Sequence, residues 1–363
     1  MLIAQRKTQF IINVLIIISL FGVSFELLMF FKSGGAFRFD SLGANYINLY
    51  SGYVRGESTV NVSYLAKIFF STVSGLSLFF ASFYFSGLTR RQKTIYIFVI
   101  VTSLLISVVG SGKQKYLGDL MVAFLIYFAF LKARRRIKSS LSRVLLFSVA
   151  GVLTVFVFMG ILGQRYEAAG ISVANINELA HPLMYWDTES IFFDLFGDES
   201  GFSLAVFLGY FTNGLYGLSL GLNLPFEWTY FVGNSYSLTR IVEIILDEPR
   251  VIADLTYPAR VGEVYGWSAS KWHSLYAWMA SDVTFYGVVV IAGFFGFLYG
   301  RLWIMSINST RLASGPLFAM LTLGLTFSLA NNQLMHGLSS ILGLMFLALL
   351  MLTIKPVKEK LRG

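Results

Sequence analysis

The chain has 363 residues, of which 56% are hydrophobic, 17% are aromatic and only 13% are charged. Soluble domains are about a quarter charged, so this composition excludes an ordinary soluble domain and favours an all-α, polytopic integral membrane protein. The net charge of +9 would suit an anionic partner, while the absence of cysteine excludes disulfide bonds and cysteine-ligated metals.

The first half of the chain carries five apolar runs that we expect to enter a membrane. They are Phe10–Phe31, Tyr64–Leu88, Thr94–Val109, Leu117–Leu131 and Val144–Leu162. A hydrocarbon core about 30 Å thick takes about 20 helical residues, and the first, second and fifth runs are of this order. The first run follows Arg6 and Lys7 and has no small-residue cleavage site soon after it, so we expect an uncleaved anchor.

The third and fourth runs are short, and the polar heptad Gly110–Tyr116 joins them. At a rise of 1.5 Å per residue, runs of about 15 residues reach only ~22 Å, so their joined ends should stop below the membrane surface. Lys113, Lys115 and Asp119 would then line a recess in the headgroup layer. The two lysines either extend along apolar surface to reach water or bind an anionic headgroup. A P-loop is excluded, because Gln114 stands where that motif requires serine or threonine.

The second half ends in three further apolar runs, Val283–Met305, Pro316–Ala330 and Leu338–Ile354. Two long polar segments, residues 164–200 and 247–282, come before them. No internal repeat is visible, so we expect residues 1–363 to form a single integral membrane domain.

Basic residues are distributed asymmetrically, and this predicts the sidedness. With the N-terminus in the cytoplasm, most of the 28 Lys and Arg residues fall in cytoplasmic turns or near the C-terminus. Both termini are then cytoplasmic, and residues 164–200 and 247–282 are periplasmic. The periplasmic side is net acidic, so the positive charge is a signal of topology and indicates no nucleic-acid partner.

The stretch Gly201–Leu246 connects two segments on the same side, so it must cross the membrane twice or enter and return. Its first part is rich in glycine and its second part carries Glu227 and Arg240, which keeps a re-entrant hairpin as an alternative. We expect two spans, Gly201–Leu222 and Pro225–Leu246. They bring the total to about 10 transmembrane helices, whereas the hairpin would give about eight.

Two arginines on the periplasmic side are candidates for binding a phosphorylated ligand. Arg165 follows an apolar run directly, on the side where basic residues are scarce, although it could equally pair with Glu167. Arg260 lies in a loop bounded by proline and glycine. A guanidinium fork suits a diphosphate better than an ammonium group does. With Lys113 and Lys115, these two residues form the predicted diphosphate-binding set.

All three histidines fall on the periplasmic side in this topology: His181, His273 and His336. Isolated histidines are more often satisfied polar residues than catalysts, and no short pair of the H-x3-H kind is present, so we expect no metal site. His273 is the preferred general base or ligand-orienting group, because Trp272 and Tyr276 lie beside it.

Asp282 is close to His273 in the sequence, but we do not expect it to be the partner of that histidine. Nine residues apart on one predicted helix, the two side chains would lie on opposite faces. We expect Asp282 to be the N-cap of the helix that begins at Val283. The many tyrosines and tryptophans of the periplasmic segments fit an interfacial aromatic belt and would also suit sugar rings.

Two stretches resemble the Wzy-type O-antigen polymerases, also called oligosaccharide repeat-unit polymerases. They are Tyr210–Ser235 (YFTNGLYGLSLGLNLPFEWTYFVGNS) and Trp272–Gly287 (WHSLYAWMASDVTFYG), the latter followed by a glycine-rich span and Asn331-Asn332-Gln333. The segment around His273 is also similar to the histidine-bearing outer segment of the related O-antigen ligases. Ser274 follows His273, however, so the His-Asn pairing usual in those ligases is absent.

The resemblance implies a GT-C-like fold and a metal-independent, inverting glycosyltransferase that needs no cofactor. Such an O-antigen (lipopolysaccharide) polymerase would join oligosaccharide repeat units on undecaprenyl pyrophosphate at the periplasmic face of a bacterial inner membrane. The implied partners are this lipid-linked oligosaccharide and membrane lipid, with a chain-length regulator left open.

The residues singled out above fit that reaction. Displacing a diphosphate requires positive charge beside the leaving oxygen, which the arginines and lysines would supply. The attacking hydroxyl requires a base, and we expect His273 or, failing that, Asp187 or Glu189 in this role. The expected substrate-binding residues are Trp272, Tyr276, Asn213 and His336.

Two other functions are compatible with the sequence. A polysaccharide transporter or flippase is the main alternative, but it would need charges at mid-membrane depth, and few are apparent. An O-antigen ligase, which transfers a finished glycan to a lipid A core, is the alternative within glycosyltransferases.

Overall fold

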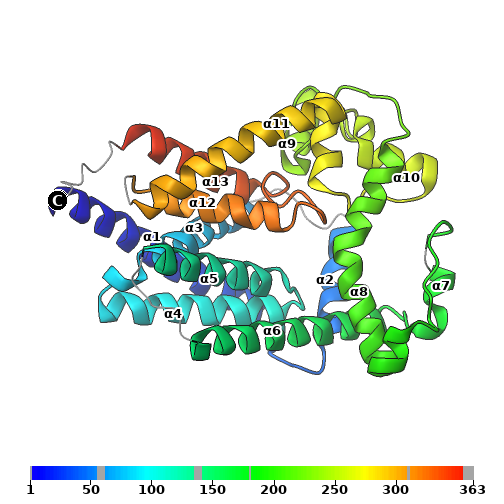
Figure 1. Ribbon diagram of the computed structural model, residues 1–363, viewed down its shortest axis with the longest axis horizontal. Coiled ribbons are helices and arrows are strands. Elements are labelled where there is room, and N and C mark those ends of the chain that lie inside the picture. Colours follow the sequence, from blue (N-terminus) through cyan, green and yellow to red (C-terminus); the bar gives the residue numbers. More distant parts are fainter. Residues whose placement is uncertain (1, 55–61, 135–140, 180, 309–310, 355–363) are drawn as a thin grey trace.

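The computed structural model describes residues 2–54, 62–134, 141–179, 181–308 and 311–354 (Figure 1). Over these ranges the protein is all-helical, with 76% helix and no strand. The prediction of an all-α fold is therefore confirmed for the described residues. Six of their helices are long and apolar enough to cross a membrane, as expected of a helical membrane protein.

These six helices run lengthwise through the molecule in Figure 1. They are α1 (Leu2–Lys32), α3 (Val62–Phe83), α4 (Arg90–Leu104) with its π-helical continuation η2 (Leu105–Gly110), α5 (Lys115–Ala133), α6 (Leu141–Ala168) and α11 (Leu275–Ile307). Two shorter apolar helices, α12 (Ser314–Thr326) and α13 (Leu338–Thr353), pack against α3.

The connecting polar segments gather at one end of the lengthwise helices, called here the α8 end. It contains α2 (Leu42–Val54), α8 (Ile191–Gly221) and α10 (Tyr257–Tyr265) (Figure 1). The short helix α7 (Ile176–Leu179) lies beyond α8. α1 begins and α13 ends at the opposite end of the molecule. The segments predicted to be periplasmic thus share one end, away from both ends of the described chain.

Aromatic packing holds the lengthwise helices together. Phe80 of α3, Phe130 of α5 and Leu347 of α13 are buried in one apolar cluster. The ring of Phe130 lies 5.1 Å from that of Trp303 in α11 and 5.5 Å from that of Phe318 in α12. Such aromatic pairs contribute about 0.5–1.5 kcal/mol beyond the area they bury. This cluster fixes α5 against α11 and α12, and α5 begins at Lys115, one of the predicted site lysines.

The α4–η2 and α5 helices are longer than the apolar runs from which they were predicted. They cover Arg90–Gly110 and Lys115–Ala133, because each takes polar residues into its first turn. Thr89 caps α4 in a capping box with Gln92. A helix of 21 residues is about 30 Å long. The expected lengths of about 15 residues are therefore too short, and both helices are long and apolar enough to cross a membrane.

The pair of spans predicted between Gly201 and Leu246 is also wrong. α8 contains the first of them, but it bends at Gly197 and crosses the ends of the lengthwise helices (Figure 1). Residues 225–235 form turns and loop, and α9 (Tyr236–Leu246) has only 11 residues. At about 16 Å, α9 cannot span a hydrocarbon core of about 30 Å. The expected count of about ten transmembrane helices included these two spans, so it is no longer supported.

Asp282 lies inside α11 and does not cap a helix at Val283, so that prediction is wrong. The helix begins at Leu275, where the Ser274 hydroxyl accepts a hydrogen bond from the Ala277 amide at 3.4 Å. A kink follows Asp282 at Thr284, whose φ is 66°. The Asp282 carboxylate points away from the helix axis and binds the 229–234 loop, as described below.

Candidate functional site

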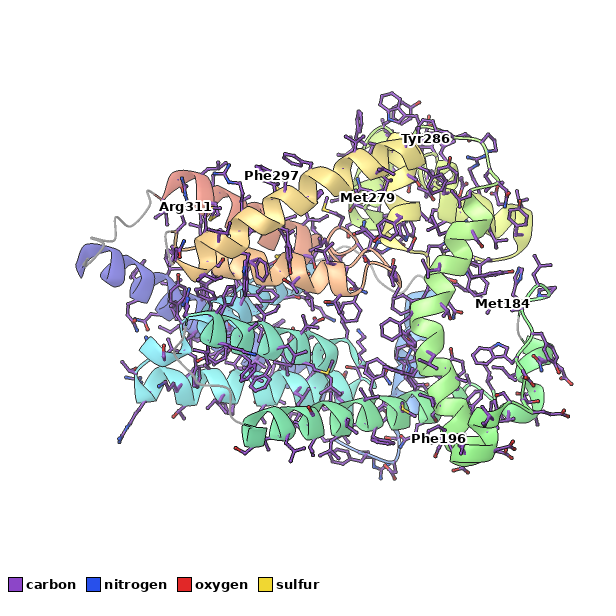
Figure 2. The ribbon with its side chains drawn as sticks, viewed as in Figure 1. Met184, Phe196, Met279, Tyr286, Phe297 and Arg311 are labelled. Atoms are coloured by element: carbon purple, nitrogen blue, oxygen red, sulfur yellow. The ribbon has the colours of Figure 1, made fainter. Side chains whose placement is uncertain are left out.

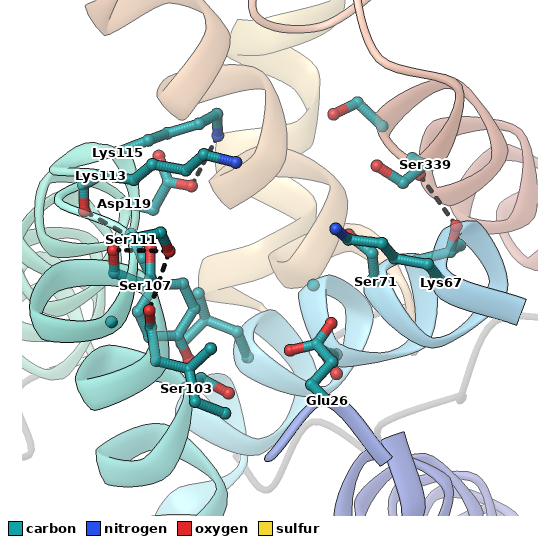
Figure 3. Close-up of a pocket in the computed structure, with 18 of the residues that line it drawn as sticks. Glu26, Lys67, Ser71, Ser103, Ser107, Ser111, Lys113, Lys115, Asp119 and Ser339 are labelled. Carbon is teal, nitrogen blue, oxygen red and sulfur yellow. Dashed lines mark hydrogen bonds and ion pairs between the residues drawn. The ribbon is translucent and has the colours of Figure 1, made fainter. Parts of the chain in front are cut away.

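A polar cavity of about 900 Å³ lies between α1, α3, η2, the start of α5 and the α12–α13 turn. Figure 3 shows that lysines and serines reach into it from several helices. Its charged lining consists of Lys67, Lys113, Lys115, Glu26 and Asp119. Three cations thus face two carboxylates in a space lined largely by helices that are long and apolar enough to cross a membrane.

The lysines enter the cavity from opposite walls. Lys67 projects from α3, while Lys113 projects from the turn before α5 (Figure 3). Both act electrostatically on the carboxylate of Glu26, which comes from α1. Lys115 instead forms an ion pair with Asp119, one helical turn away, with 2.7 Å between Lys115 Nζ and Asp119 Oδ2. The pair Lys67 and Lys113 therefore supplies the cationic centre of the cavity.

The backbone between η2 and α5 positions Lys113. Gly112 has a φ of +61°, which L-residues rarely adopt, and a Cβ there would lie 2.2 Å from the Leu42 carbonyl oxygen. The Ser111 hydroxyl donates to the Ile106 and Ser107 carbonyl oxygens at 2.9 and 3.2 Å. These bonds satisfy carbonyls at the end of the π-helix, and they hold the turn closed with Lys113 on the cavity wall.

Lys113 and Lys115 were predicted from the sequence to line a recess, and both line this cavity. Glu26 and Lys67 were missed. The signal was present, because each is a charged residue inside an apolar run, where charges are costly and usually functional.

A chain of polar and aromatic contacts leads from the cavity toward His273. Gln114, between the two cavity lysines, accepts a hydrogen bond from Arg165 at 3.3 Å, and Arg165 also donates to the Tyr210 hydroxyl at 3.4 Å. The guanidinium lies 3.3 Å from the ring centroid of Tyr46. The Tyr210 ring is in turn 4.8 Å from that of Trp272. The predicted residues Arg165 and Trp272 are therefore linked through α8, beside the cavity.

His273 is fully buried next to Trp278 and is not among the residues that line the cavity. Its Nε2 hydrogen-bonds the Ser268 carbonyl oxygen at 3.2 Å. Ring contacts continue from His273 to Trp278 at 6.4 Å and from Trp278 to His336 at 4.5 Å. His273 Nδ1, Trp278 Nε1 and His336 Nδ1 are all buried without a hydrogen-bond partner in the described part of the chain. The predicted base is thus enclosed together with the predicted substrate residue His336.

We expect the protein to lose stability as the pH falls from about 6.5 to about 4. Burial lowers the pKa of His273 to about 4. Burial and the nearby His273 lower the pKa of His336 to about 4. Across this window the unfolded chain binds more protons than the folded one, so full stability is present only above about pH 6.5. Thermal unfolding followed by tryptophan fluorescence would show the Tm falling through the window.

His336→Asn is the matched variant for this pH effect, since it removes one of the two titrating rings. Its Tm should depend less steeply on pH between 4 and 6.5 than that of the native protein. An unchanged slope would rule His336 out as a contributor.

Arg260 lies apart from the cavity lining and is held by local partners. Its guanidinium lies 3.0 Å from Glu227 Oε1 and donates to the Pro225 carbonyl oxygen at 2.7 Å. It is buried on α10, close to the Tyr257 ring. These contacts fasten α10 to the loop before α9, so Arg260 does not converge with Lys113 and Arg165.

The remaining predicted residues lie on other parts of the α8 end. Asp187 and Glu189 are exposed in the loop before α8, where the Asp187 carboxylate accepts the Glu189 amide at 3.2 Å. Asn213 is half-buried on α8, and the Tyr276 hydroxyl lies 3.5 Å from Ser328 Oγ. None of these residues lines the 900 Å³ cavity. The predicted set is therefore divided, since Lys113 and Lys115 line the cavity and the other predicted residues lie outside its lining.

No metal site is indicated either. In the described ranges no group of three or more His, Asp or Glu side chains is placed to hold a metal ion.

Comparison with protein-family models, with curated proteins and with solved structures gives no match. The functional argument therefore depends on the geometry described above.

Proposed function

We propose that the protein is a membrane glycosyltransferase acting on oligosaccharides linked to a polyprenyl diphosphate, with the diphosphate bound in the 900 Å³ cavity. The observation that carries this proposal is the charged lining itself. Lys67, Lys113 and Lys115 outnumber Glu26 and Asp119 in a space walled by membrane-spanning helices. An excess of positive charge in this lining favours the binding of an anionic ligand.

The position of the cavity suits a lipid-borne substrate. α1, α3 and α5 are all long enough to span a membrane, so a ligand between them can keep its hydrocarbon tail in lipid. The Arg165 contacts extend from Gln114, which lies between two cavity-lining lysines, to the Tyr210 and Trp272 rings. Aromatic faces beside polar groups are suited to binding sugar rings, so the glycan would extend toward the α8 end.

The proposed reaction is a displacement at the anomeric carbon of the donor sugar. A hydroxyl oxygen of the acceptor forms a bond to that carbon while the bond to the diphosphate oxygen breaks. Lys67 and Lys113 would stabilise the charge that develops on the leaving diphosphate. The hydroxyl proton passes to a carboxylate, and Glu26 is better placed for this than Asp187 or Glu189 because it lines the cavity.

Within this proposal the protein is an O-antigen polymerase of the bacterial inner membrane. A transporter or flippase is the second candidate, because Glu26 and Lys67 are charges inside membrane-spanning helices, as a translocation path requires. A polymerase forms new glycosidic bonds, whereas a transporter only moves its substrate across the membrane. A single reconstituted assay therefore distinguishes the two functions.

The test is to incubate the purified protein in lipid nanodiscs with a synthetic polyprenyl-diphosphate-linked oligosaccharide. A polymerase yields a ladder of longer lipid-linked glycans and free polyprenyl diphosphate, both measurable by mass spectrometry. Products formed only when a lipid A core acceptor is added would identify a ligase. Movement of the donor across vesicle membranes without a new glycosidic bond would replace the proposal with a transporter.

A further inference from the structure

α9 presents its apolar side to the outside of the molecule and its polar side to the inside. Thr239 and Glu243 are buried, one turn apart, on one face. At 100° per residue, Ile241 and Ile245 lie on the opposite face, and Ile245 is 75% exposed. A surface helix in water places its apolar stripe toward the core. This inverted arrangement is expected where the surroundings of the helix are apolar.

The buried polar side of α9 is fully used in holding the helix to the protein. The Thr239 hydroxyl donates to the Val232 carbonyl oxygen at 2.8 Å. The Glu243 carboxylate accepts hydrogen bonds from the Ile252 and Ala253 amides at 3.2 and 2.8 Å. The orientation of α9 is thus fixed by its polar contacts, and its isoleucines cannot turn inward without breaking them.

The loop before α9 adds an exposed aromatic group. The Trp228 ring lies 4.8 Å from that of Tyr230 and 5.3 Å from that of Phe231, and Phe231 is 64% exposed. Tyr230 and Phe231 have φ values of 56° and 63°, a conformation that is unfavourable for bulky residues. Strain of this kind persists where the surroundings enforce it and often marks a functional segment.

This apolar surface continues onto a membrane-spanning helix. The loop is attached to α11 through Thr229, whose hydroxyl donates to the Ser281 carbonyl oxygen at 2.7 Å. Just beyond the α11 kink, Tyr286 and Val290 are 88% and 75% exposed. Figure 2 shows Tyr286 and Phe297 pointing outward from the same edge of α11. α11 is one of the six helices that can cross a membrane, so lipid is the medium that its exposed edge meets.

We propose that α9 and the Trp228–Phe231 loop insert into the lipid leaflet at the α8 end, where α9 lies in the boundary between headgroups and acyl chains. Interfacial helices of this kind bury an apolar face about 5–10 Å into that boundary. Polar residues mark the edge of the inserted surface, since Asp247, Glu248 and Arg250 are exposed directly after α9. This surface binds lipid hydrocarbon and is independent of the reaction proposed for the cavity.

The natural absence of cysteine makes a direct test available, because each introduced cysteine is the sole labelling site. Ile245→Cys and Phe231→Cys would carry a nitroxide spin label in nanodiscs of phosphatidylcholine and phosphatidylglycerol. Collision with oxygen, which concentrates in hydrocarbon, is compared with collision with a water-soluble nickel chelate. Phe294→Cys on the lipid-facing edge of α11 and Glu248→Cys at the polar edge are the matched controls.

Both test positions should resemble Phe294→Cys, with a ratio of oxygen to nickel collisions several-fold above that of Glu248→Cys. A ratio at Ile245→Cys equal to that at Glu248→Cys would place α9 in water and overturn the proposal. Low collision with both reagents, together with spin–spin broadening lost on dilution with unlabelled protein, would show a second copy on this surface and also overturn it. Thermal unfolding of each labelled variant verifies that it is folded.

Discussion

Replacing Lys113 by glutamine is expected to lower kcat/KM for a lipid-linked oligosaccharide donor by about 10- to 100-fold. Hydrogen bonds to charged groups contribute about 1.5–3 kcal/mol, and each 1.4 kcal/mol corresponds to a factor of ten. Glutamine keeps a donor of similar reach but removes the positive charge. The cavity would then hold two cations against two carboxylates and would lose the excess charge that favours an anion.

Lys67→Gln should reproduce this loss, because Lys67 approaches the cavity from the opposite wall and acts on the same Glu26 carboxylate. Lys93→Gln is the control for loss of a lysine as such. Lys93 lies in the first turn of α4, 5.2 Å from the centroid of the Phe85 ring, and does not line the cavity. Rates equal to that of the native protein in both cavity variants would show that the diphosphate binds elsewhere.

The apolar helices are the part of the fold that the sequence predicts well. Apolar runs in the sequence predict α1, α3, α6 and α13. Whether a segment can cross a bilayer depends on its hydropathy and length, and both can be read from the segment itself. The ends of α4 and α5 are less predictable. Their first turns are polar, and the Thr89–Gln92 capping box extends the helix beyond the apolar run.

The stretch 201–246 could not be predicted from its own residues. Moderate hydropathy, glycines and scattered charges fit a span, a hairpin and an interfacial helix equally well. The outcome depends on Asp282, distant in sequence, which binds the loop between α8 and α9. Only the buried Glu243 shows which side of α9 faces the protein.

The candidate site was only partly predicted, because some of its residues are brought together by contacts between distant parts of the sequence. Lys113 and Lys115 lie beside each other in the sequence, and the short polar turn between two apolar runs was enough to place them. Glu26 and Lys67 join them only because α1 packs against α3. The burial of His273 also depends on tertiary packing, since a Cβ at Gly217 would lie 2.7 Å from its Nδ1. α8 therefore approaches that ring as closely as glycine allows.

Replacing Asp282 by alanine is expected to give the largest loss of stability of the variants considered. Its carboxylate is buried and accepts hydrogen bonds from the Gly233 amide at 3.0 Å, the Asn234 amide at 2.9 Å and Asn234 Nδ2 at 2.6 Å. The Thr229 hydroxyl shares its single proton between this carboxylate and the Ser281 carbonyl oxygen. Removing the acceptor leaves several buried donors unsatisfied, each costing about 1–3 kcal/mol. We expect a total loss of about 3–5 kcal/mol.

Asp254→Ala is the matched control, because Asp254 is a carboxylate of the same end of the molecule in an exposed ion pair with Arg250 at 2.6 Å. Exposed pairs contribute about 0–1 kcal/mol, so its Tm should stay close to that of the native protein. Asp282→Asn should have a Tm between those of the two alanine variants, since its amide keeps one acceptor oxygen but turns a donor toward the loop amides.

Tryptophan fluorescence on heating gives the Tm, and limited proteolysis reports whether residues 225–235 open first. If Asp282→Ala melts with Asp254→Ala, the loop is held by its other contacts. The strained Tyr230 and Phe231 would then be supported by lipid and by α9, rather than by the carboxylate.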